Sequence, residues 1–216
     1  MNLNKRIAEI GIPNQMKHLR ISEEGYPVPW FVHWVDENTP DFRVFNEEKF
    51  RSAFQNNRCW LCGKILGKYK TFVIGPMCMI NRVNAEPPSH RACATYAAMT
   101  CPFLTQPKMR RNEVRELPEN KKIAGIPIMR NPGVCVLWTT YDFKPVKVNG
   151  GILFELGKPE GVEFFAQGRP ATRDEVLASI VTGLPLLREA DNYDPTAMRM
   201  IDERVAEAMK LLPEAA

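Results

Sequence analysis

The sequence lacks any apolar run close to the roughly 18 residues that a membrane-spanning helix requires. Its first segment, MNLNKRIAEIGIP, also lacks the apolar h-region of a secretory signal peptide. Both absences argue against membrane insertion and against secretion. We therefore expect a cytoplasmic protein without membrane association, in which the six cysteines stay reduced.

Histidine is scarce, with three residues in a chain of 216, and the Walker loop, GxGxxG, GxSxG and HExxH motifs are absent. The signatures of the common nucleotide-binding, hydrolase and zinc-protease classes are thus missing. The hydrophobic fraction of 44% and the charged fraction of 25% are those of an ordinary globular protein. The net charge of +4 at pH 7 permits an acidic partner but does not demand one.

Short apolar runs, turn residues and helical spacing predict an α+β fold. Strands are expected at 30–35, 41–45, 69–75, 133–141, 151–157 and 161–168, and helices at 47–57, 90–101, 173–183 and from Pro195 onward. Thr172 and Glu175 form a capping box for the third helix, and Gly183 stands where a helix usually ends. Small antiparallel sheets followed by C-terminal helices are therefore expected.

Composition divides the chain into three predicted parts. Residues 1–104 form a cysteine-rich N-terminal portion, residues 105–122 form a basic linker or loop bounded by prolines, and residues 123–216 form a strand meander with C-terminal helices. The first and last parts are expected to pack as one unit. The chain shows no internal repeat or low-complexity tract.

Five of the six cysteines fall between positions 59 and 101. In the opening CWLCG, thiolates three residues apart can point at one ion, and Gly63 lets the backbone bend around them. In the closing SHRAC, Ser89 is the expected N-cap of a helix, which places His90 and Cys93 on one face of its first turn. The positive end of that helix favours a thiolate at Cys93.

A knuckle, a strand and two ligands at the start of a helix form the treble-clef arrangement of structural zinc fingers. We therefore predict a treble-clef-like module over residues 59–101, with Zn²⁺ held by Cys59, Cys62, His90 and Cys93, or with Cys78 in place of His90. Three other interpretations stay open: a redox pair, a disulfide scaffold, and unrelated buried thiols. The absence of a βαβ pattern weighs against the redox pair, and the expected cytosolic context weighs against the disulfide scaffold. The paired spacings weigh against unrelated thiols.

A catalytic role for this zinc is not expected. HNH-type nucleases place a histidine between the two halves of a treble clef, and no histidine lies between Cys62 and His90. His18 and His33 lie outside the position where a general base would be needed. A site with four protein ligands also has no open position to activate water, so the ion is predicted to be structural.

The loop between the two halves, NRVNAEPPSHR, is rich in polar side chains. Arg82, Glu86 and Arg91 could gather near the helix N-terminus and bind an anion, and an enzyme acting there on a small or phosphorylated ligand is the alternative function. The simpler interpretation is that Arg82 and Glu86 pair with each other at the surface.

The linker 105–122 carries six basic and three acidic side chains. Such a segment could contact the phosphates of a nucleic acid. A basic loop with interspersed glutamates is also typical of a solvated surface. The candidate nucleic-acid-binding or anion-binding residues are Arg82, Arg91, Lys108, Arg110, Arg111 and Arg115.

The segments CWLCGK, FVIGPMCMINR and EPPSHRAC, with VPWFVHW before them and GRPATRDEVLASI after them, resemble a family of uncharacterised bacterial and phage proteins. The resemblance covers residues from about 28 to 188 and supports His90 and Cys93 as a ligand pair, but it implies no substrate. We expect a zinc-stabilised binding protein with a protein or nucleic-acid partner, in a phage or host-interaction context.

Overall fold

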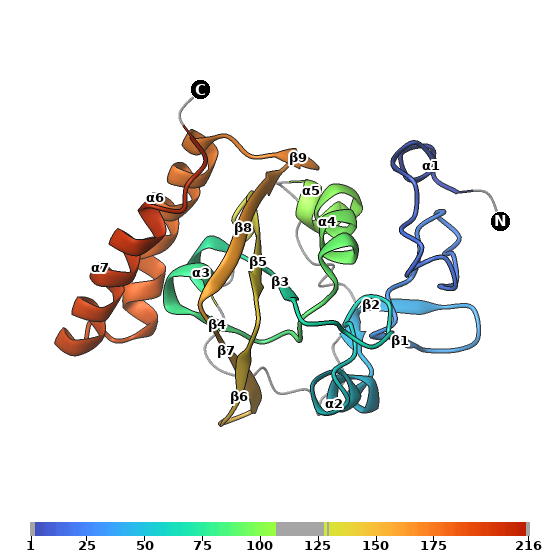
Figure 1. Ribbon diagram of the computed structural model, residues 1–216, viewed down its shortest axis with the longest axis horizontal. Coiled ribbons are helices and arrows are strands. Elements are labelled where there is room, and N and C mark those ends of the chain that lie inside the picture. The colour runs from blue at the N-terminus through green and yellow to red at the C-terminus, as the bar shows by residue number, and fades with distance from the viewer. Residues whose placement is uncertain (1–2, 107–127, 129, 215–216) are drawn as a thin grey trace.

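The computed structural model describes residues 3–106, 128 and 130–214 (Figure 1). Its helices are α1 Lys5–Ile10, α2 Glu47–Gln55, α3 Pro76–Asn81, α4 Arg91–Thr100, α5 Pro102–Thr105, α6 Arg173–Ala190 and α7 Pro195–Met209. Its strands are β1 Val32–Trp34, β2 Pro40–Phe45, β3 Lys70–Ile74, β4 Val83–Asn84, β5 Cys135–Thr140, β6 Phe143–Val148, β7 Gly151–Leu156, β8 Pro159–Ala166 and β9 Arg169–Pro170.

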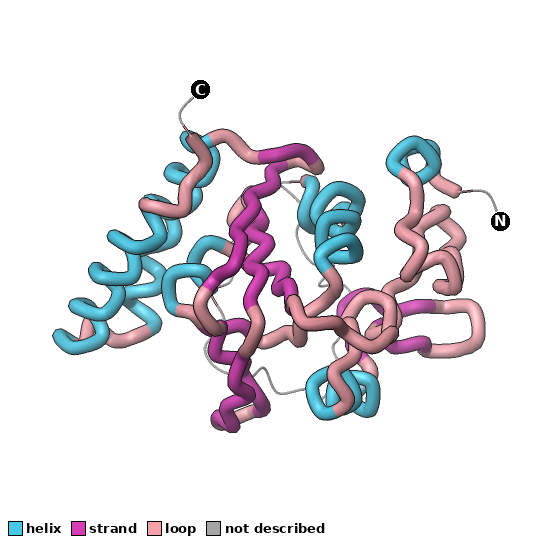
Figure 2. Tube along the Cα trace, in the orientation of Figure 1, coloured by secondary structure: helices cyan, strands magenta, loops and turns pink. Residues whose placement is uncertain are grey.

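The predicted α+β class is confirmed. The strands form small antiparallel sheets, and the last two helices follow them at the C-terminal end of the chain (Figure 2). Across the described residues, no helix combines the length and the apolar character that crossing a membrane would take.

Strand β5 is the centre of the fold. It pairs with β3 on one side and with β8 on the other, in a sheet ordered β3-β5-β8-β9. All six of its residues are buried, because helices cover both faces of this sheet. Val136 and Trp138 pack with residues of α3, α6 and α7, whereas Cys135 and Leu137 pack with residues of α4. Figure 1 shows these two helical layers on opposite sides of the strands.

Strands β5 to β8 form one long, bent hairpin. Strand β6 pairs with β7 from Phe143 opposite Leu156 to Val148 opposite Gly151, and the short β4 pairs with the other side of β7. The bend lies between the two sheets, where the N–H of Gly157 donates to the carbonyl of Asp142 at 3.2 Å. A Cβ on Gly157 would overlap that carbonyl oxygen, so this bend requires glycine.

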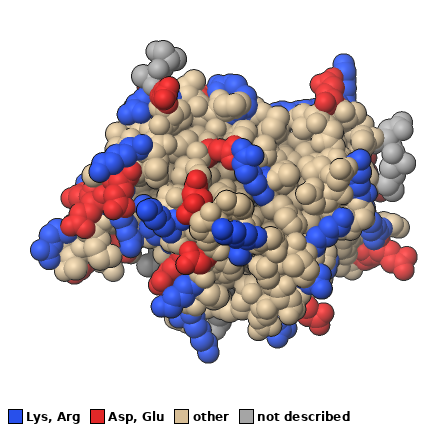
Figure 3. All heavy atoms as spheres, in the orientation of Figure 1, with Lys and Arg blue, Asp and Glu red and all other residues tan. Residues whose placement is uncertain are grey.

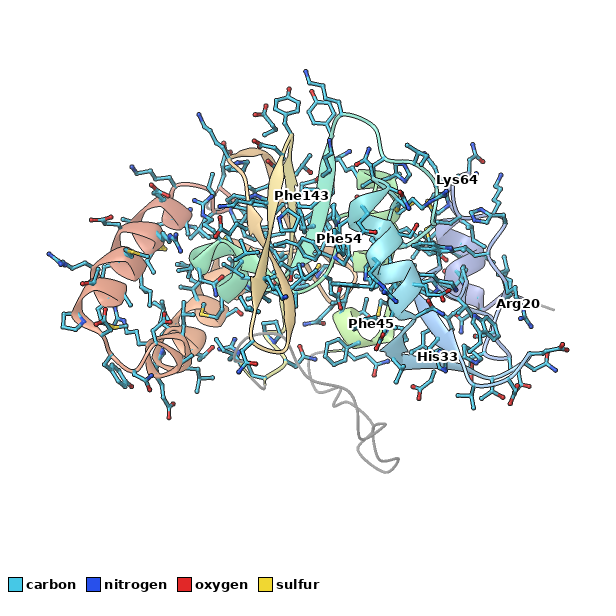
Figure 4. All side chains as sticks on the ribbon, turned by 90° about the horizontal axis from the view of Figure 1, so that it is seen from below. Arg20, His33, Phe45, Phe54, Lys64 and Phe143 are labelled. Carbon is cyan, nitrogen blue, oxygen red and sulfur yellow. The ribbon has the colours of Figure 1, made fainter. Side chains whose placement is uncertain are left out.

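An aromatic cluster joins the cysteine-rich portion to the long hairpin. Phe50 and Phe54 of α2 lie 5.9 and 5.8 Å from the ring of Phe154 in β7. Phe50 also lies 5.7 Å from Trp60, which sits between two of the cysteines. Figure 4 places Phe54 between α2 and the strands, near Phe143. Residues from both sides of the predicted linker therefore share one packed cluster.

The linker itself cannot be compared with its prediction. Residues 107–127 lie outside the described residues, and only its first positions are placed, with Thr105 ending α5. The boundaries at 104, 105–122 and 123 therefore stay a prediction.

Side chains cap the starts of α2 and α6, and the capping box predicted for α6 is confirmed. The side chain of Asn46 accepts from the N–H of Lys49 at 3.0 Å at the start of α2. Thr172 and Glu175 form a reciprocal capping box at the start of α6, with hydrogen bonds of 3.3 and 2.8 Å. In both cases the side chains satisfy N–H groups that the first helical turn leaves free.

The predicted helix end at Gly183 is wrong, and some elements, β6 and α3 among them, are absent from the prediction. Helix α6 continues through Gly183 to Ala190, because this glycine allows close packing: an added Cβ would lie 2.8 Å from Met77 Sδ and 2.9 Å from Arg130 Nη1. Strand β6, which is not among the expected strands, contains Pro145, and a proline is tolerated where a strand forms the edge of its sheet. The short helix α3, which Pro76 opens at its first position, was not expected either.

Candidate metal centre

The segment around Cys59 and Cys62 folds into a tight knuckle. Arg58 and Ile65 form an isolated antiparallel bridge, and inside it the N–H of Gly63 donates to the carbonyl of Cys59 at 2.8 Å. Gly63 has a φ of 74°, which a residue with a Cβ rarely adopts. The N–H of Cys62 points at Cys59 Sγ at 3.4 Å, as expected when backbone amides support a thiolate. The turn thus directs both sulfurs to the same side.

A β-bridge between Thr71 and Ser89 places the second pair of donors, His90 and Cys93, beside the knuckle. Ser89 donates to the carbonyl of Thr71 at 2.7 Å and accepts from its N–H at 2.9 Å. The prediction that Ser89 caps the helix is wrong, because these two bonds hold Ser89 extended and the helix begins one residue later. His90 is the N-cap of α4, with φ −64° and ψ 144°, and Cys93 is three residues further on.

The structure brings the four predicted donors together. One ligand atom from each of Cys59, Cys62, His90 and Cys93 lies within 4.8 Å of all the others. The three cysteines are buried and His90 is partly exposed. Within the part of the chain that the structure describes, this is the one group of three or more His, Cys, Asp or Glu residues that could hold a metal ion.

The imidazole of His90 is oriented by a hydrogen bond on its far side. Its Nε2 lies 3.0 Å from the carbonyl oxygen of Ile65, which can only accept, so Nε2 carries the proton. In the neutral ring, Nδ1 then offers a lone pair toward the sulfurs, 3.4 Å from Cys62 Sγ and 3.9 Å from Cys93 Sγ. Metal-binding histidines commonly have their second nitrogen fixed in this way.

The electrostatics of the cluster favour a cation. Burial opposes ionisation of the Cys59 thiol, but hydrogen bonds with Cys62, Cys93 and His90 outweigh burial and lower its pKa. Hydrogen bonds with Cys59 and Cys62 in turn raise the pKa of His90 to about 10. Hydrogen bonds with the same two cysteines, together with burial, raise the pKa of Cys93. Protons hold the donors together when no metal is bound, and a divalent cation would replace those protons.

Two contacts of the centre were not expected from the sequence. The N-terminal segment covers the cysteines: Ile7 and Met16 belong to the same buried cluster as Cys59, Cys62 and Cys93. His18 Nε2 lies 3.0 Å from the carbonyl oxygen of Cys62 and therefore donates to it. These residues are 41 or more positions before Cys59, and no local pattern marks them as neighbours of the knuckle.

The other cysteines lie elsewhere. Cys78, the alternative fourth ligand, is on α3 and packs against the main core, so the structure does not bring it to the group of four. Cys135 is 4% exposed at the start of β5, as expected of a small buried apolar residue, and burial raises its pKa to about 12.

Arg82 and Arg91, the candidate arginines within the described residues, are each paired and are not brought together. Arg82 pairs with Glu207 at 3.0 Å and lies 4.3 Å over the ring of Trp138, whereas Arg91 binds both oxygens of Glu163 at 2.7 and 2.6 Å. Glu163 lies opposite Leu137 in the sheet, so its partner Arg91 is on the face to which Leu137 points. Arg82 lies over Trp138, the next residue along the strand, which points to the other face. The two arginines therefore lie on different faces of the sheet.

Neither of two hollows on the described part of the surface is lined by Arg82, Glu86 or Arg91. Surface hollows of about 680 Å³ at the tip of the β6–β7 hairpin and about 270 Å³ beside Trp34 are lined by other residues among those described. The remaining candidates, Lys108, Arg110, Arg111 and Arg115, lie outside the described residues.

Replacing Gly63 should loosen the knuckle. In Gly63→Ala the new Cβ would lie 2.7 Å from the ring of Trp30, on a residue whose φ is 74°. Backbone strain and overpacking together should lower the free energy of unfolding by about 2–4 kcal/mol, and metal affinity should fall with it. Urea unfolding and competition with a chromogenic chelator measure the two effects.

Gly67→Ala is the matched control, since the added Cβ meets no non-adjacent atom within 4 Å there. That variant should stay within about 0.5 kcal/mol of the parent. Equal effects of the two substitutions would show that the Gly63 turn does not shape the centre.

The centre thus consists of a knuckle and a helix start, held side by side by β3 and covered by the N-terminal segment. Its three sulfurs and one imidazole nitrogen could hold a metal ion. Comparison of the chain with protein-family models, with curated proteins and with solved structures finds no match.

Proposed function

We propose that this centre holds one structural Zn²⁺ and that the protein acts by binding a macromolecular partner, a nucleic acid or a protein, in a bacterial or phage setting. The observation that carries the zinc assignment is the convergence of four donors, Cys59, Cys62, His90 and Cys93, within 4.8 Å. Thiolates with one imidazole in a group of four are the donor set and number that zinc takes in structural sites.

The donor arrangement supports a structural rather than a catalytic ion. Catalytic zinc sites keep one position for water or substrate, but here protein atoms supply all four ligands. His90 uses its second nitrogen on the Ile65 carbonyl, and the N–H groups of Cys62 and His90 both point at Cys59 Sγ at 3.4 Å. When bound, the ion would link the knuckle to α4 and stabilise the N-terminal cover packed on both.

Substitution of the metal by Co²⁺ tests whether the site is closed. The cobalt protein should show the intense absorption of a tetrahedral site with three thiolates, and added cyanide, azide or imidazole should leave that spectrum unchanged. A spectrum that titrates with any of these small ligands would reveal an open position and contradict a structural role. Cys135→Ser should give the parent spectrum, because Cys135 lies outside the group of four.

A further inference from the structure

The chain from Lys49 to Ala85 contains no aspartate or glutamate. Seven basic residues lie in this stretch: Lys49, Arg51, Arg58, Lys64, Lys68, Lys70 and Arg82. It runs through most of α2, the knuckle and β3, so the knuckle half of the metal centre, with Cys59 and Cys62, lies in a long stretch whose charged side chains are all basic. In Figure 3 the largest group of acidic spheres lies instead at the left, over α6 and α7.

The loop from the knuckle to β3, KILGKYK, presents side chains to solvent. Ile65 and Tyr69 are 59% and 51% exposed, and Lys64 and Lys68 are exposed with them. Lys64 lies on the outer surface beside α2 in Figure 4, well away from His33. The loop thus places one exposed aliphatic and one exposed aromatic side chain among lysines.

Tyr69 is supported from below by a second aromatic ring. The pairing of Lys70 with Thr140 places Tyr69 beside Tyr141, with ring centroids 4.9 Å apart and the hydroxyl groups 3.1 Å apart. Lys68 Nζ lies 4.4 Å over the ring of Tyr141. The backing ring and the strand hold Tyr69 in place, so a flat ligand could stack on it with little loss of side-chain entropy.

We propose that this knuckle surface, formed by Lys64, Ile65, Lys68, Tyr69, Lys70 and Tyr141, binds single-stranded nucleic acid. The lysines would contact backbone phosphates, and an unpaired base would stack on Tyr69. Stacking selects single strands, because the base faces of a duplex are not accessible. Two acidic groups lie beside this surface: Glu160, which forms a side-chain hydrogen bond with Tyr141, and Asp142, which follows Tyr141 in the chain. The three lysines outnumber them, so positive charge remains in the majority.

The inference rests on the proposed function, because the knuckle that a bound ion would fix also positions this loop. The chain should be tested metal-loaded and at full length, with fluorescence anisotropy of labelled single strands of DNA and RNA of about 12 nucleotides. Binding should weaken with salt, with a slope of log K against log salt of about −2 for three lysine contacts. A duplex of the same sequence should bind less tightly.

The variants separate stacking from general charge. Tyr69→Ala should weaken single-strand binding about 5- to 150-fold, whereas Tyr69→Phe, which keeps the ring, should stay close to the parent. Lys64→Ala and Lys68→Ala should each reduce the salt slope by about 0.7. Tyr193→Ala is the control, since Tyr193 is 60% exposed at the distant turn between α6 and α7.

Three results would overturn the inference. One is the absence of salt-dependent binding to any of these strands. Another is binding that survives Tyr69→Ala but is lost when Arg110 and Arg111 become alanine, which would place the contact on the linker. The third is binding to an acidic peptide alone, which would make the partner a protein. In each case a closed cobalt spectrum would leave the proposed zinc site standing, so the two failures are distinguishable.

Discussion

Cys93→Ser should release the metal and unfold the knuckle together with the N-terminal segment packed on it. Cys93 is fully buried in the cluster that also contains Cys59, Cys62, Ile7 and Met16. A hydroxyl is a poor zinc ligand, so the variant would lose the link between the knuckle and α4. The expected cost is on the order of 4 kcal/mol, a fall in Tm of about 10 °C, because binding of structural zinc is coupled to folding.

Metal analysis and hydrogen exchange measure this effect. The variant should contain less than one metal ion per chain after dialysis, and amide protection should be lost around the knuckle and the N-terminal segment while α6 and α7 keep theirs. Cys135→Ser is the control: Cys135 is also buried, but it lies outside the group of four and should keep the metal. Equal metal loss in the two variants would contradict the ligand assignment.

Phe154→Ala should destabilise the whole protein rather than one part of it. Phe154 is fully buried, and its ring lies within 6.5 Å of four others, those of Phe50, Phe54, Phe72 and Phe143. Removing a ring of this size from a core costs about 3–5 kcal/mol, because the neighbours collapse only in part. Phe50 and Phe54 belong to α2, before the linker, and Phe154 lies after it. The loss of stability should therefore affect the parts of the chain on both sides of the linker.

Thermal unfolding followed by two probes tests this coupling. Near-ultraviolet circular dichroism and the charge-transfer band of the cobalt protein should report the same, lowered Tm in Phe154→Ala. Phe42→Ala removes the same ring from a residue that is 50% exposed and should change the free energy of unfolding by less than about 1 kcal/mol. Two separate transitions, with the cobalt band unaffected, would show that the parts do not share a core.

The group of four donors could be predicted because its signals are local. Cys59 and Cys62 lie in one turn, His90 and Cys93 lie at one helix start, and metal geometry demands little more than these two pairs. The error at Ser89 shows the limit of local patterns. A serine before a helix usually caps it, but the two backbone bonds to Thr71, formed across 18 residues of sequence, hold Ser89 in an extended strand-like position.

Other features depend on contacts that no local pattern encodes. Glycine is the residue type that commonly follows the end of a helix, yet Gly183 lies inside α6, where the absence of a side chain lets the helix pack closely against Met77. His18 and the N-terminal segment cover a centre far along the chain. The pairing of Arg82 with Glu207 rather than with the expected Glu86 joins residues 125 positions apart. Tertiary contacts decided each case, and a single sequence carries no record of them.

X-ray absorption at the zinc edge of the purified, reduced protein tests the central claim most directly. The claim predicts one zinc ion per chain, with three sulfur ligands at about 2.3 Å and one nitrogen ligand at about 2.0 Å, supplied by Cys59, Cys62, Cys93 and His90. A coordination shell containing a water oxygen, or a protein that folds fully with no metal under reducing conditions, would contradict it.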